Sequence, residues 1–143
     1  MCGGTGVRKV VLKITTNDIC PCVWRAVFRV ALSHYSRIQY GVQMCTVRRV
    51  RRGRQGSWDL PELDYCADFE CACVRAASQN RIDEAVVRLY HLSGLPWRQC
   101  AERLGIDRGA FFHRAYAMEE KIGRLVALMR PHSLIPFSAY VSA

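Results

Sequence analysis

The chain has 143 residues, half of them apolar, which suffices for one compact domain or one domain with an arm and excludes a multidomain enzyme. Lys and Arg number 21 against 12 Asp and Glu, and the resulting formal charge of +9 indicates a polyanionic partner such as nucleic acid. Charged residues interrupt every apolar stretch before the roughly 18 residues of a membrane span, and residues 1–6 lack a signal-peptide pattern. We therefore expect a cytoplasmic protein with no membrane partner.

The excess positive charge is confined to the first part of the chain. Residues 1–58 carry 11 basic residues and one acidic residue, whereas 59–143 carry 10 basic and 11 acidic residues. Turn-forming residues at 53–57 precede Pro61, which disfavours helix before it, so a boundary is expected near 53–61. The predicted fold is mainly α: a basic, partly irregular N-terminal segment over 1–58, then a small helical bundle with a tail over 59–143.

Two elements are expected in the basic segment. The β-branched residues of Val7–Ile14 favour a short strand, and Pro21–Tyr40 is predicted to be a helix. One face of that helix would carry Trp24, Phe28, Ala31 and Leu32.

An arginine-rich strip follows this helix. Its five arginines, within eight residues, are Arg48, Arg49, Arg51, Arg52 and Arg54. Such a strip is either a solvated, disordered stretch or an arm that contacts phosphates, and the two interpretations stay open.

Eight cysteines would suggest a disulfide framework in a secreted protein, but without an export signal reduced thiols are expected. The tightest pairs, Cys20 with Cys22 and Cys71 with Cys73, have one residue between them, whereas zinc knuckles have two to four. Cys66 and Cys73 lie seven residues apart and would share one buried helical face. We expect core thiols and neither a metal nor a cofactor.

The second part of the chain is helical by pattern. A helix over Leu63–Ser78 would bury positions 66, 69, 73, 74 and 77, and a second helical period runs through positions 82, 86, 89, 90 and 92. Gly94 supplies a stop, and Pro96 opens the next element.

A short turn then joins two further helices. Trp97–Leu104 is predicted to be a two-turn helix that ends at Gly105, and Asp107 is positioned to cap the next helix near Ala110. That helix, about 108–129, has apolar residues at 111, 115, 118, 122, 125 and 129. This spacing is typical of a helix-turn-helix, whose second helix enters a major groove of DNA.

The stretch Leu89–Arg114, with Leu-Ser-Gly-Leu-Pro-Trp-Arg-Gln-Cys-Ala-Glu-Arg-Leu-Gly-Ile-Asp at its centre, resembles region 4 of sigma-70-type RNA polymerase sigma factors. The resemblance covers about 65–130 and implies a short helical bundle that reads the −35 promoter element and docks on the polymerase flap. Arg114 falls where the family often has an arginine on the recognition helix. Phe111, Phe112 and His113 replace the family's small and polar run, and the region that melts the −10 element has no counterpart.

If Phe111 faces the core, the side chains on the opposite face of the predicted helix 108–129 point towards the DNA major groove. Arg108 is the candidate for bidentate contact with guanine, and Trp97 and Arg98 are positioned to meet the DNA backbone. The full set of candidate DNA-binding residues is Trp97, Arg98, Arg108, Phe112, His113, Arg114, Tyr116, Lys121 and Arg124.

Catalysis is not expected, because the chain has no phosphate loop or nucleophile elbow and its four histidines lack motif spacing. The sequence thus favours a sequence-specific protein that binds double-stranded DNA in transcription, with RNA polymerase as a second candidate partner. The alternative is an adaptor that binds polymerase or a regulator without reading bases. The target sequence and the oligomeric state stay open.

Overall fold

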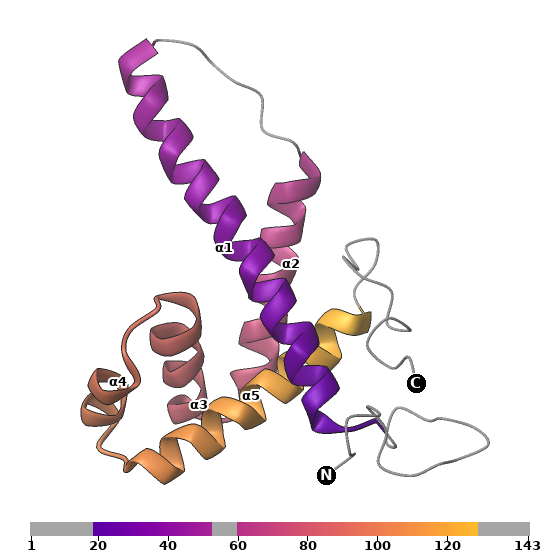
Figure 1. The fold of residues 1–143 in the computed structure, drawn as a ribbon, viewed down its shortest axis with the longest axis vertical. Helices are drawn as coiled ribbons and strands as arrows, with labels where there is room; N and C mark the ends of the chain where they lie inside the picture. The colour runs from indigo at the N-terminus through magenta and orange to yellow at the C-terminus, as the bar shows by residue number, and fades with distance from the viewer. Residues whose placement is uncertain (1–18, 53–59, 129–143) are drawn as a thin grey trace, which may run out of the picture.

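A computed structural model describes residues 19–52 and 60–128, and this part of the chain is mainly helical, as expected. The predicted strand at 7–14, Arg54 and the tail after 128 lie outside the described residues. The elements are α1 (Pro21–Arg52), α2 (Leu60–Ala77), α3 (Arg81–Val86), the π-helical turn η1 (Val87–Leu92), α4 (Trp97–Leu104) and α5 (Arg108–Leu128). In Figure 1, α1 crosses α5 and runs on beside α2, whereas α3 and α4 surround the first half of α5.

Helix α1 begins at Pro21 as expected, because proline tolerates the missing amide hydrogen at a first helical position. Trp24, Phe28 and Ala31 are buried on one face, which confirms the predicted apolar stripe. The helix ends at Arg52 rather than near Tyr40, so the prediction was too short.

The arginine-rich strip therefore has a helical backbone over 48–52. The side chains of these arginines, like the whole of Arg54, lie outside what the structure describes.

Helix α2 packs its stripe of small and aromatic residues against α1 and α5. Cys66, Phe69 and Cys73 are buried as predicted, and burial raises the pKa of the Cys73 thiol to about 12, so this thiol stays protonated. Val74 is 67% exposed, which corrects its expected burial. Val74 is rotated by about 100° around the helix from Cys73 and therefore faces outward. Ala72, which precedes Cys73, is buried and completes the stripe.

The third helical segment changes its winding midway. Asn80 caps α3, where its Oδ1 accepts hydrogen bonds from the amides of Ile82 at 2.8 Å and Asp83 at 3.4 Å. The following turn has five-residue hydrogen bonds, such as Ser93 N–H to the Arg88 carbonyl at 3.0 Å, where a continuous α-helical period was predicted. This π-helical turn is an insertion that an α-helical pattern does not reveal.

The π-helical turn carries a buried histidine. His91 is 9% exposed and lies edge-on to Phe28 of α1, with 4.9 Å between ring centroids. Burial lowers the pKa of His91 to about 4, with a smaller contribution from Arg29 in the same direction, while a hydrogen bond with the Ala115 backbone opposes the shift. The imidazole is therefore neutral at neutral pH, and it belongs to the core.

The main core joins all three long helices. It includes Phe28 of α1, Phe69 of α2, and Met118 and Ile122 of α5. Helices α1 and α5 approach closely at Gly123, where a Cβ atom would lie 2.0 Å from the Trp24 carbonyl oxygen. The buried residues of 19–38, in the basic segment, thus share a core with the nearly neutral second part of the chain. None of the described helices is long and apolar enough to cross a membrane.

Candidate nucleic-acid interface

A three-residue turn joins α4 to α5. Gly105 adopts a left-handed conformation with φ 63° and ψ 33°, a region that a residue with a Cβ rarely occupies. The Ile106 amide donates to the Ala101 carbonyl at 3.1 Å, which closes the end of α4. The Asp107 carboxylate accepts from the Ala110 amide at 2.9 Å, so the predicted cap is confirmed.

A second small core holds α4 and α5 together. Phe111 and Ala115 of α5 are fully buried against Cys100 and Ala101 of α4 and Val86 of α3. Ala101 is buried in this core, and its small side chain lets α5 approach α4. Phe111 thereby fixes which face of α5 remains outside.

Three aromatic rings continue from this core onto the surface. The ring centroid of Phe112 lies 5.5 Å from that of Trp97 and 5.8 Å from that of Tyr116. All three rings keep part of their surface exposed, and Tyr116 is 43% exposed. They form a continuous row from α4 along the first half of α5.

Arginines flank this row at both ends. The guanidinium of Arg108 lies 5.6 Å from the ring centroid of Trp97, and that of Arg98 lies at the same distance from this ring. The guanidinium of Arg25, on α1, lies 5.1 Å from the ring centroid of Tyr116. An arginine stacked on a ring keeps the edge of its guanidinium for hydrogen bonds to phosphate or base. We call Arg25, Arg98 and Arg108 with the three rings the aromatic–arginine row.

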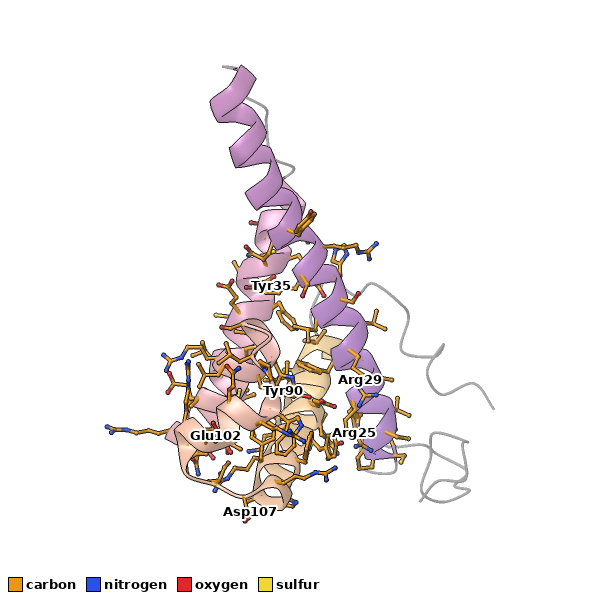
Figure 2. The ribbon with its side chains drawn as sticks, turned by 60° about the vertical axis from the view of Figure 1, so that its left-hand side comes forward. Arg25, Arg29, Tyr35, Tyr90, Glu102 and Asp107 are labelled. Atoms are coloured by element: carbon orange, nitrogen blue, oxygen red, sulfur yellow. The ribbon has the colours of Figure 1, made fainter. Side chains whose placement is uncertain are left out.

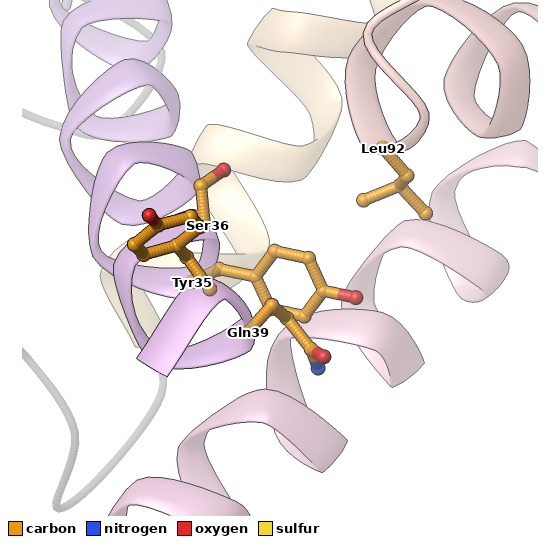
Figure 3. A pocket seen from close by; sticks show the side chains of 5 residues that line it. Tyr35, Ser36, Gln39 and Leu92 are labelled. Carbon is orange, nitrogen blue, oxygen red and sulfur yellow. The ribbon is translucent and has the colours of Figure 1, made fainter. Parts of the chain in front are cut away.

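An open hollow of about 430 Å³ adjoins the row at the turn between α4 and α5. It is lined by Trp97, Arg98, Ala101, Glu102, Gly105, Ile106 and Arg108. A second hollow of about 310 Å³ lies between α1 and η1, lined by Tyr35, Ser36, Gln39, Tyr40 and Leu92 (Figure 3). No cluster of three or more His, Cys, Asp or Glu side chains with metal-site geometry occurs within residues 19–52 and 60–128.

Two of the candidate DNA-binding residues form ion pairs within the bundle. Arg114 Nη1 lies 2.7 Å from Asp83 Oδ1, and the two side chains are 31% and 14% exposed. Arg124 Nη2 lies 2.8 Å from Glu120 Oε1, and its guanidinium is 5.2 Å from the ring centroid of Trp24. Both arginines therefore link parts of the bundle.

His113 and Lys121 are both exposed on α5, with a rotation of about 80° around the helix between them. His113 follows Phe112 and points outward beside the aromatic–arginine row. Lys121 lies five residues after Tyr116, a rotation of about 140° around the helix, and is turned away from the row.

Three charged groups at this face, Arg25, Arg29 and Glu119, were not among the candidate residues. Arg25 reaches Tyr116, and Arg29 Nη2 lies 3.5 Å from Oε2 of Glu119, which is 6% exposed. Burial raises the pKa of Glu119, and the positive charges of Arg29 and Arg25 oppose that shift. The four-residue spacing of Arg25 and Arg29 was the available signal, since it places both on one side of α1.

Comparisons of the chain with protein-family models, with curated proteins and with solved structures find no match.

Proposed function

We propose that the protein binds double-stranded DNA sequence-specifically and acts in transcription, with α4 and α5 as a helix-turn-helix whose second helix enters the major groove. The observation that carries the proposal is the exposed aromatic–arginine row on the first half of α5, directly after a turn fixed by Gly105 and Asp107. A rigid turn sets the angle of the recognition helix, and the row presents the groups that contact DNA.

Each exposed group has a role that suits its chemistry. Arg108 donates to guanine in a bidentate contact worth about 1–3 kcal/mol of discrimination, and Phe112 packs against a thymine methyl group. His113 donates to a base or to a phosphate. Arg98, on the supporting helix, meets the backbone and sets the register without reading sequence.

The first test is selection of bound sequences from a pool of random duplexes. The wild-type chain is expected to enrich one motif, and the double variant Arg108→Ala, His113→Ala is expected to lose that preference. Lys121→Ala is the matched control, because it removes a charge from the turned-away side of the same helix and should leave the motif unchanged. Absence of any enriched motif with the wild-type chain would refute base readout.

RNA polymerase is the second proposed partner, supported by the resemblance of 65–130 to sigma region 4. Polymerase binding by the wild-type chain together with absence of an enriched motif would favour the adaptor function. Loss of the motif in the double variant with polymerase binding intact would favour DNA readout.

A further inference from the structure

The start of α1 lies beside the exposed face of α5. Figure 2 shows Arg25 and Arg29 on α1 where it passes α5. Their neighbours on α5 are Tyr116, under the Arg25 guanidinium, and Glu119, 3.5 Å from Arg29. Arg25 thus belongs to the aromatic–arginine row, and Arg29 lies about one helical turn farther along α1.

Both arginines keep part of their surface exposed, Arg29 more than Arg25. Arg25 forms no ion pair with any residue in the described part of the chain and stacks on a ring that is 43% exposed. The Arg29 side chain is 64% exposed, although its Nη2 contacts Glu119. The buried Glu119 carboxylate attracts both arginines and holds them at this edge of α5.

The spacing along α5 matches the dimensions of duplex DNA. Arg108 and Tyr116 are eight residues apart, which corresponds to a rise of about 12 Å along the helix. The major groove of B-DNA is also about 12 Å wide, with a phosphate backbone along each edge. Arg98, next to one end of this interval, and Arg25, at the other end, can therefore contact phosphates on both edges while Arg108 and the residues after it face the bases.

We propose that Arg25 and Arg29 bind the phosphates along the groove edge opposite to the one that Arg98 contacts. This inference rests on the proposed function, and it assigns to α1 a part of the DNA interface. Arg25 also supplies a charge with no ion-pair partner in the described part of the chain, whereas Arg114 and Arg124 of α5 are engaged in ion pairs within the bundle.

The test is the salt dependence of binding to a labelled 30-base-pair duplex of mixed sequence, measured by fluorescence anisotropy from about 50 to 200 mM KCl. Each lost phosphate contact makes the negative slope of log K against log salt concentration shallower by about 0.9. The ratio of the affinity at 50 mM to the affinity at 200 mM KCl should therefore be about 3.5-fold smaller for Arg25→Gln than for wild type. Arg37→Gln, an exposed arginine farther along α1, is the matched control and should leave the slope unchanged. Arg25→Lys retains the charge and should retain the slope.

Arg29 is tested together with Glu119, so that the buried carboxylate is not left without its partner. The double variant Arg29→Gln, Glu119→Gln should lower the slope by about 0.9 relative to Glu119→Gln alone. Thermal melting identifies variants that fail to fold. In every variant that folds, the enriched motif should stay the same, because phosphate contacts carry no sequence information.

A chemical probe locates the contact. Cys22 is exposed and lies three residues before Arg25, so an iron chelate attached there should cleave the DNA backbone on one flank of the motif. The same chelate on Cys71, which is exposed on α2, is the control and should not cleave there. Each probe is attached to a chain in which Cys2, Cys45 and the other exposed cysteine of the Cys22 and Cys71 pair are replaced by serine.

The outcomes separate the two proposals. An unchanged slope in Arg25→Gln, with an enriched motif that depends on Arg108 and His113, would overturn the role of α1 and leave readout by α5 intact. Absence of duplex binding by the wild-type chain would overturn both.

Discussion

Gly123→Ala tests the crossing of α1 and α5. The added Cβ would lie 2.0 Å from the Trp24 carbonyl oxygen, 2.7 Å from its carbonyl carbon and 3.3 Å from its Cα. All three are backbone atoms inside a helix, so no side-chain rotation relieves the contact. Because non-bonded carbon atoms attract at about 3.5–4.0 Å, the two helices must separate by more than about 1 Å.

Two effects of opposite sign set the magnitude. Overpacking of this kind costs about 1–3 kcal/mol, and the backbone contact places this site at the upper end or beyond. Alanine regains about 1 kcal/mol of helix propensity relative to glycine. The net expectation is a loss of about 2 kcal/mol in the free energy of unfolding, or about 8 °C in Tm.

Urea unfolding followed by circular dichroism measures this loss. Gly41→Ala makes the same substitution in α1, where no atom lies within 4 Å of the added Cβ, and it should stabilise the protein by about 0.5–1 kcal/mol. The two substitutions therefore have opposite signs. A Gly123→Ala protein as stable as Gly41→Ala would show that the helices do not cross at Gly123.

Three further predictions concern single groups. The pKa of His91 is 6.5 in the unfolded chain and about 4 in the folded protein, so the unfolded state binds more protons between these two pH values. The contribution of His91 to the free energy of unfolding therefore falls as the pH falls from 6.5 to 4, by at most about 3 kcal/mol. His91→Leu should lack this contribution when urea unfolding at pH 7 and pH 4.5 is compared with wild type, and an identical pH dependence in both proteins would contradict burial of a neutral imidazole. A double-mutant cycle of Arg114→Ala and Asp83→Ala should give a coupling of about 1 kcal/mol in the free energy of unfolding. Arg114→Ala should leave the enriched DNA motif unchanged. A coupling of zero, or an altered motif, would indicate that Arg114 contacts DNA instead. Asp107→Ala should cost about 1 kcal/mol and Asp107→Asn much less, and equal losses in thermal melts would rule out the cap.

Local sequence patterns predicted the turn between α4 and α5 closely. The glycine at 105, the cap at 107 and the inward residues Phe111, Ala115 and Met118 all depend on interactions within a few residues. Such interactions follow from backbone sterics and the 3.6-residue period.

Features that depend on distant parts of the chain were not predictable from these patterns. The approach of Gly123 to Trp24 joins residues about a hundred positions apart. The π-helical turn lets Val87 and His91 reach the main core while Val86 reaches the second core, and a simple periodic stripe does not anticipate that change. Tertiary packing determines both.

The same limit applies to the candidate interface. Arg108 and Phe112 come together because both lie on the first two turns of α5, which helical geometry predicts. Arg114 is drawn to Asp83, 31 positions earlier, and a single helix gives no sign of that partner. A charged residue on a recognition helix is therefore assigned to DNA only after its neighbours in the fold are known.

The distribution of charge has a different meaning once the fold is known. The sequence separates a strongly basic first part from a nearly neutral second part, which suggests a charged arm beside a recognition domain. In the structure, Phe28 packs in one core with Phe69 and Ile122, so the helix that carries Arg25 is part of the body that carries α5. Residues on a helix fixed in the core keep their charges at a fixed distance from α5, whereas a flexible arm loses conformational entropy each time it binds. The positive charge on α1 near α5 is thus preorganised, and in the proposed complex it would strengthen DNA binding without the ordering cost that an arm incurs.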